Sequence, residues 1–198
     1  MDQDPDQELL GRLRAGDEQA FVMLVRRHHD AMLRLARGYV PSVAVAEEVV
    51  QDTWLGVLRG LGGFEGRSSV RTWLFRILVN RARTAGVRER RSIAVSNPEP
   101  AVDPSRFDQS GAWATPPEHW VEEADDRLDA VKLADRLRSA IDGLPDRQRE
   151  VVMLRDVEGL SSEDVCSVLD LSEGNQRVLL HRGRSRLRQI LETEFGRA

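Results

Sequence analysis

Apolar residues recur at helical spacing along most of this chain, and no segment alternates apolar and polar residues as a half-buried strand would. Such spacing gives a helix one apolar side to bury against its neighbours. The sequence therefore predicts an all-α fold. The expected helices cover 6–15, 17–39, 43–61, 69–90, 126–142, 145–157, 162–169 and 173–194.

A proline-rich, acidic stretch separates these helices into two groups. Five prolines within 92–125 prevent a continuous helix there. We therefore expect two small helical domains, 1–91 and 126–198, joined by a flexible acidic linker. Trp113 and Trp120 flank a Pro-Pro pair in this linker. They either pack the linker onto one domain or bind a partner, and the sequence leaves these alternatives open.

Several classes of protein are disfavoured by the composition. No apolar run approaches the roughly 20 residues needed to cross a bilayer, and the acidic N-terminus is unlike a secretory signal. The single cysteine, Cys166, cannot form an internal disulfide, which fits a reducing compartment. His28 and His29 are adjacent and would point in different directions on a helix, which makes a poor metal pair. We expect a cytoplasmic protein that is not an enzyme and holds no metal or cofactor.

The charge is strongly segregated although its net value is only -4. Residues 67–91 hold eight arginines against one acid, and 92–126 hold eight acids against one arginine. Residues 171–198 are basic again, with six arginines against three acids. Two basic islands, one in each half of an acidic chain, indicate two separate contacts with a polyanion.

The C-terminal island lies in a predicted helix-turn-helix. Ser161 and Asp164 form a capping-box pattern, a short helix follows, and 170–172 provide a tight turn before a long basic helix. In such motifs the first turns of the long helix read base edges, while later arginines hold phosphates. The candidates for reading bases are Arg177, Val178, His181 and Arg182, and those for phosphate are Arg184 and Arg188.

The N-terminal island differs because aromatic residues alternate with its arginines, from Phe64 through Trp73 and Phe75 to Arg83. Aromatic side chains beside cations suit unstacked bases, since stacking on one base is worth about 1–3 kcal/mol. Trp73 is either such a platform or part of the core. Leu74 and Leu78 are better explained as core residues.

Two blocks of sequence resemble conserved regions of the sigma-70 family of RNA polymerase sigma factors. The block AEEVVQDTWLGVLRGLGGFEG at 46–66, with RSSVRTWLFRILVNRAR at 67–83, is similar to the second region of that family. LPDRQREVVMLRDVEGLSSEDVCSVLDLSEGNQRVLLHRGRSRLRQ at 144–189 is similar to its fourth region. The absence of a domain between the two blocks is typical of the extracytoplasmic-function (ECF) group.

This resemblance implies partners and residue roles. It implies binding to the clamp helices and flap of core RNA polymerase, to duplex promoter DNA and the non-template single strand, and to an anti-sigma factor. Glu48, Gln51 and Asp52 match positions that dock on the clamp helices. The residues that match the capture of the promoter −10 element are Phe64, Arg67, Ser68, Ser69, Trp73, Arg76, Asn80 and Arg83. The resemblance assigns the −35 element to the basic helix, at Arg177, Val178, His181 and Arg182.

Two positions depart from the family pattern. Gln176 stands where an apolar residue is common, and Val178 where a small polar one is common. An alternative reading of the C-terminal half is an ordinary helix-turn-helix regulator with a helical N-terminal domain. Such a regulator would carry a ligand cavity or a dimer seam in its N-terminal domain. This chain instead has an acidic docking helix followed by an arginine–aromatic block in that half.

Overall fold

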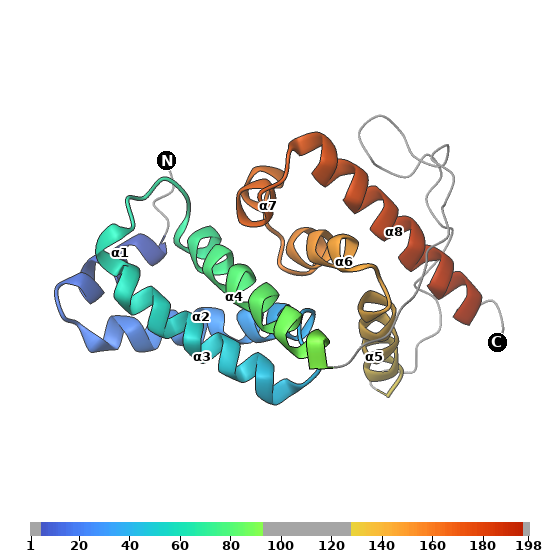
Figure 1. The fold of residues 1–198 in the computed structure, drawn as a ribbon, viewed down its shortest axis with the longest axis horizontal. Coiled ribbons are helices and arrows are strands. Elements are labelled where there is room, and N and C mark those ends of the chain that lie inside the picture. Colours follow the sequence, from blue (N-terminus) through green and yellow to red (C-terminus); the bar gives the residue numbers. More distant parts are fainter. Residues whose placement is uncertain (1–4, 93–127, 196–198) are drawn as a thin grey trace. The chain divides into compact units, whose positions relative to one another are not determined.

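The computed structural model describes residues 5–92 and 128–195, with side chains for 6–87 and 134–193. Every regular element within these ranges is a helix (Figure 1), which confirms the all-α prediction. The predicted linker, with Trp113 and Trp120, lies outside the described residues except for its first position, Ser92. None of the described helices combines the length and the hydropathy needed to span a membrane.

The N-terminal half forms a bundle in which α2, α3 and α4 pack on one another and α1 packs on α2. Its elements are α1 (Pro5–Arg14), α2 (Glu18–Arg37), α3 (Val43–Gly60), the short 3-10 helix η1 (Leu61–Gly63) and α4 (Val70–Ser92). Burial of apolar side chains holds these helices together. The fully buried ones include Leu24, Met32, Leu35, Val50, Val57, Val70, Leu74, Phe75 and Leu78.

Side-chain caps fix where these helices begin. The Asp17 carboxylate accepts hydrogen bonds from the backbone N–H groups of Gln19 and Ala20. The Ser42 hydroxyl accepts one from Val45 N–H, at 3.2 Å. Each cap satisfies donors that the first turn of a helix leaves unpaired. The helix ends in this half lie within two residues of the predicted ones.

The C-terminal half contains α5 (Leu128–Asp142), α6 (Asp146–Val152), η3 (Met153–Val157), α7 (Ser162–Leu169) and α8 (Glu173–Phe195). The single helix predicted over 145–157 is wrong in one respect, because its second part, η3, is a π-helical turn. The N–H of Glu158 bonds to the carbonyl of Met153 at 2.8 Å, which closes this wider turn. Gly159, with φ of +67°, then turns the chain toward α7.

The local signals of the helix-turn-helix are confirmed. Ser161 Oγ accepts a hydrogen bond from Asp164 N–H at 3.0 Å and donates one to the Asp164 carboxylate at 2.6 Å. Asp170 then ends α7 in the left-handed conformation, with φ of 57°. Its N–H returns to the carbonyl of Cys166. The chain order is therefore a capped short helix, a tight turn and a long helix.

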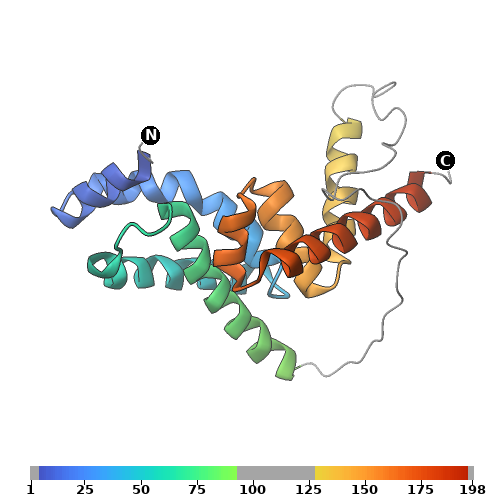
Figure 2. The same cartoon turned by 90° about the horizontal axis from the view of Figure 1, so that it is seen from above.

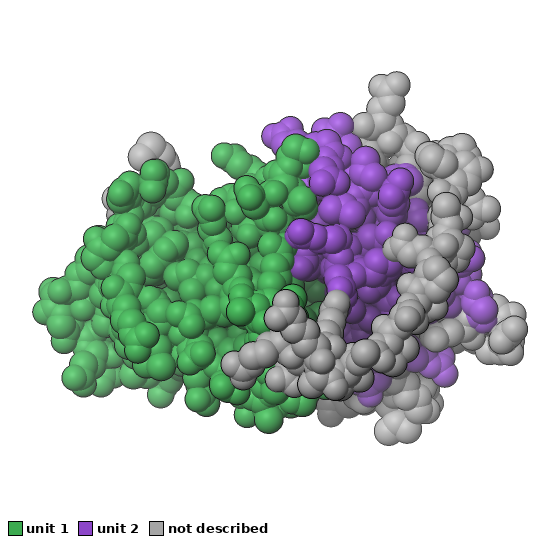
Figure 3. Space-filling model, in the orientation of Figure 1, with its two compact units in different colours: residues 1–96, 153–172 green, residues 97–152, 173–198 purple. Residues whose placement is uncertain are grey.

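The described residues form two compact units that do not follow the order of the chain (Figure 3). The first unit joins 5–92 with 153–172, because α7 packs on α4 (Figures 1 and 2). The second unit joins 128–152 with 173–195, where α8 packs on α5 and α6. The predicted domain boundaries stay a prediction.

Candidate nucleic-acid and protein interfaces

The first candidate surface is the acidic face of α3, which we define by Glu48, Gln51 and Asp52. All three side chains are exposed, and positions three and four apart share one side of a helix. The opposite side is buried in the bundle through Val49, Val50, Thr53, Trp54 and Val57. A helix buried on one side thus presents these three polar side chains to solvent.

The same exposed face continues with two apolar residues that the sequence analysis did not single out as surface. Leu55 is 50% exposed and Leu58 is 41% exposed. Leu58 follows the buried residues Val50 and Trp54 at helical spacing, yet the structure leaves it exposed. An apolar end beside an acidic end is a surface suited to a protein partner more than to DNA.

The second candidate surface begins at the loop between η1 and α4, which carries Phe64. Arg14 of α1 donates to the carbonyl oxygens of Leu61, at 2.9 and 3.1 Å, and of Phe64. The rings of Phe64 and Trp73 lie 4.9 Å apart, tilted by 42°. Trp73 is only partly buried, whereas Phe75 is fully buried. The tryptophan thus packs on the loop and keeps part of its surface open, while Phe75 belongs to the core.

Side chains on α4 extend this surface along the helix. At about 100° per residue, Trp73, Arg76, Asn80 and Arg83 fall within about 80° of one another, and we call them the α4 stripe. Arg76 and Asn80 are exposed, and Arg83 is half-buried. At the helix start, Ser69 Oγ accepts the N–H of Thr72 at 3.1 Å, which places Ser68 and Ser69 beside the first turn. Arg67 is exposed in the loop.

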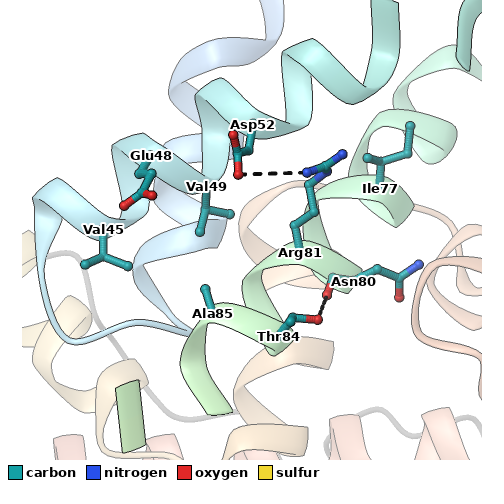
Figure 4. Close-up of a pocket in the computed structure, with 9 residues that line it drawn as sticks. All are labelled: Val45, Glu48, Val49, Asp52, Ile77, Asn80, Arg81, Thr84 and Ala85. Carbon is teal, nitrogen blue, oxygen red and sulfur yellow. Dashed lines mark hydrogen bonds and ion pairs between the residues drawn. The ribbon is translucent and has the colours of Figure 1, made fainter. Parts of the chain in front are cut away.

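A hollow of about 490 Å³ lies between α3 and α4, with Glu48 and Asp52 on one wall and Asn80 and Arg81 on the other (Figure 4). Arg81 Nη1 lies 3.9 Å from the Asp52 carboxylate. Gly56 leaves room for this arginine, because a Cβ at position 56 would lie 2.6 Å from Arg81 Nη2. The Asn80 amide points away from both acids (Figure 4). The acidic face and the α4 stripe are therefore neighbours that present their polar groups in different directions.

The third candidate surface is the N-terminal part of α8. Arg177, Val178 and Arg182 are exposed, and His181 is half-buried. Burial, followed by the positive charge of Arg182, lowers the pKa of His181 below its usual range. The imidazole is therefore neutral near pH 7 and can donate or accept a hydrogen bond. Farther along, Arg184 is half-buried and Arg188 is paired with Glu192.

The other side of α8 packs within its own unit. Leu187 and Leu191 are buried, and Gly183 lies so close to α6 that a Cβ there would be 2.7 Å from Val152 Cγ2. Gln176, where an apolar residue was expected, is also buried. Packing on one side and arginines on the other match the arrangement expected of a duplex-reading helix.

Comparison with known proteins identifies the family. Residues 24–92 match Sigma-70 region 2, and residues 134–187 match Sigma-70, region 4. The ECF RNA polymerase sigma-E factor of Salmonella typhimurium is 31% identical over 179 residues, which are 90% of each chain. The chain belongs to the ECF group of the sigma-70 family.

Two solved structures have a fold similar to that of this sigma factor. CnrH, solved in complex with the cytosolic domain of CnrY, has a TM-score of 0.66 and 25% identity, over 96% of this chain and 99% of that one. The sigma factor RpoE of Bartonella quintana, solved with the anti-sigma factor NepR, has a TM-score of 0.59 and 23% identity, over 87% and 96% of the two chains.

The matched regions contain nearly all of the candidate residues of this sigma factor. The acidic face, the Phe64 loop and the α4 stripe lie in region 2, and the α8 residues lie in region 4 except Arg188, one position beyond its end. Sequence reasoning missed Arg14, which precedes the region 2 match and holds the loop. No local signal could have found it, because its acceptors are 47 and 50 residues away.

Proposed function

We propose that this sigma factor binds core RNA polymerase, directs it to promoters with −10 and −35 elements, and promotes strand opening. The role requires binding surfaces and no bond-breaking chemistry from the chain, and it belongs in the cytoplasm with the polymerase. An anti-sigma factor is a further partner that we expect, because a sigma factor of similar fold was solved with one.

For polymerase docking, the acidic face of α3 supplies the contact with the clamp helices. Its carboxylates are exposed and belong to a different helix from the α4 stripe. A basic partner can therefore cover Glu48 and Asp52 while Arg76 and Asn80 stay available to DNA. Leu55 adds apolar area next to the acids, so that docking also removes hydrophobic surface from water.

The observation that carries the proposal is the aromatic pair of Phe64 and Trp73 at the head of a stripe of exposed polar groups on α4. A duplex offers no free base face to such a pair, whereas a separated strand does. Stacking worth about 1–3 kcal/mol per base offsets the few kcal/mol lost on unstacking. Opening is then favoured because the open strand makes contacts that the duplex cannot make.

In this proposal, α8 recognises duplex DNA. Arg177 and Arg182 are exposed near its N-terminus, the part of a recognition helix that contacts base edges in the major groove. A bidentate arginine–guanine contact discriminates by about 1–3 kcal/mol. His181, neutral near pH 7, adds a hydrogen-bonding group.

Run-off transcription tests the proposal. Core RNA polymerase with this sigma factor should give transcripts with defined starts from promoter DNA, and Arg177→Ala should reduce them about tenfold by weakening −35 binding. Arg37→Ala is the matched control, because it removes an exposed arginine of α2 that no proposed surface uses. A chain that binds duplex DNA alone and gives no defined start with core polymerase would be an ordinary regulator.

A further inference from the structure

Helix α1 precedes the region 2 match, and its last residue, Arg14, reaches the loop that carries Phe64. The Arg14 side chain donates from Nε and Nη2 to the carbonyl oxygen of Leu61, at 3.1 and 2.9 Å. Nη2 also donates to the carbonyl oxygen of Phe64. One guanidinium group therefore binds the backbone at the start of η1 and again just after its end.

A second residue of α1 lies near the same loop. Gly66 turns the loop with φ of +73°, and a Cβ at position 66 would lie 4.0 Å from Gln7 Nε2. Gln7 and Arg14 are seven residues apart, which is about two turns, so they share one side of α1. This side of α1 therefore faces the loop at both of its ends.

Helix α1 is itself fixed to the bundle. Leu9 and Leu10 are 4% and 2% exposed, and α1 packs on α2. The Asp6 carboxylate also bonds to His28 of α2. Arg14 thus reaches the loop from a helix that is held in place, and it can transmit that fixed position to the backbone of Phe64.

The position of the Phe64 backbone determines where its ring lies. Only two side-chain torsions separate this ring from the backbone that Arg14 binds. The ring lies 4.9 Å from that of Trp73, and a Cβ at Gly60 would lie 3.6 Å from Trp73 Cζ2. A loop that is already ordered avoids the loss of entropy that ordering it on a ligand would cost.

We propose that Arg14 is a positioning residue for capture of the −10 strand. It holds the Phe64 loop in the shape that receives an unpaired base, and α1 thereby becomes part of the −10 surface. This inference rests on the proposed function. An arginine suits the role because its planar fork of N–H donors can serve two carbonyl oxygens at once. Arg14 acts through the loop and makes no contact of its own with DNA.

The test measures how tightly the complete holoenzyme binds a single-stranded oligonucleotide with the −10 sequence of a promoter identified by run-off transcription. Arg14→Gln should weaken this binding about three- to tenfold, because fewer molecules hold the loop in the receptive shape. Arg14→Lys should recover only part of the loss, since an ammonium group lacks the fork. Arg26→Gln removes an exposed arginine of α2 and is the matched control, which should bind like wild type.

Two further measurements separate positioning from a direct contact with DNA. In a Phe64→Ala chain, Arg14→Gln should weaken binding by less than about twofold more, because Arg14 acts through that loop. The slope of log affinity against log salt should be the same in Arg14→Gln as in wild type, since no phosphate contact is lost. A slope smaller by about one, or full recovery in Arg14→Lys, would reveal a phosphate contact and overturn the proposal.

Binding of −35 duplex distinguishes positioning from a general loss of structure. Arg14→Gln should bind −35 duplex like wild type. Equal losses for the −35 duplex and the −10 strand, or unchanged −10 affinity in Arg14→Gln, would overturn the positioning role. The proposed function fails separately, if the wild-type holoenzyme gives no defined transcript.

Discussion

Asp6 is a buried carboxylate in the first turn of α1, and it joins that helix to α2. Its Oδ2 lies 2.6 Å from His28 Nε2, and Oδ1 accepts a hydrogen bond from Arg27. Burial raises the pKa of Asp6, but the contacts with His28 and then Arg27 outweigh it, so the pKa lies below the usual 3.8. The ionised form is therefore favoured by folding.

The sign of this shift predicts how stability depends on pH. A carboxyl with a lowered pKa in the folded state contributes stability that is present above the unfolded pKa and is lost as pH falls through the folded one. Asp6→Asn should lower the free energy of unfolding by about 1–3 kcal/mol at pH 7. The difference from wild type should shrink as pH falls below 3.8. Urea denaturation of both chains at pH 7 and pH 3 measures this difference in the free energy of unfolding.

Asp30→Asn, at an exposed acid on α2, serves as the control and should change stability little at either pH. If Asp6→Asn were destabilised equally at pH 7 and pH 3, the ionised carboxylate would not be the source of the stability.

Single residues show how far sequence reasoning reaches. Helical spacing correctly assigned Leu74 and Leu78 to the core. Trp73 is half-buried, and its role as a stacking platform stays a prediction. Spacing gave no sign that Glu158 is buried, and its hydrogen-bond partner Arg34 lies 124 positions earlier. Periodicity describes one helix at a time and carries no information about such a distant partner.

Among the helices, the packing of α8 on α6 depends on a glycine. A Cβ at position 183 would meet Val152 Cγ2 at 2.7 Å and the Gln148 carbonyl oxygen at 3.4 Å. These atoms belong to a buried side chain and to backbone, so neither can move freely. The absence of a side chain at Gly183 allows the two helices to approach this closely.

Gly183→Ala should therefore destabilise the chain by about 1–3 kcal/mol through overpacking, despite the gain in helix propensity. Val152→Ala in the same chain should recover part of that loss by making room. The control is Gly174→Ala, where a Cβ meets nothing within 4 Å. Thermal unfolding compares the variants, and a Gly183→Ala chain as stable as Gly174→Ala would contradict the close approach.

Helix ends were more predictable than helix contacts. The starts of α3 and α7 are fixed by the N-cap residues Ser42 and Ser161. Such caps can be recognised from the sequence. The π-helical turn of η3 was missed, because its five residues are too few for apolar spacing to reveal a wider turn. The contact of α7 with α4 was also missed. It joins residues in separate predicted domains, where order along the chain suggested no contact.

For the molecule as a whole, segregated charge explains how an acidic chain can serve two contacts with DNA. The net charge of -4 coexists with an arginine-rich α4 and α8. Acids gather instead on the exposed face of α3 and in the 92–126 stretch. In the proposed function, polymerase contact and DNA contact use different helices, so that each can be weakened without removing the other.

The central claim is that α4 captures the unpaired −10 strand and that α8 binds the −35 duplex. Permanganate footprinting of the −10 region tests it most directly, with core polymerase and either wild type or Asn80→Ala. We predict that Asn80→Ala loses most of the permanganate reactivity of unpaired −10 thymines while binding of −35 duplex stays within about twofold of wild type. Unchanged −10 reactivity in Asn80→Ala, with −35 binding intact, would contradict it.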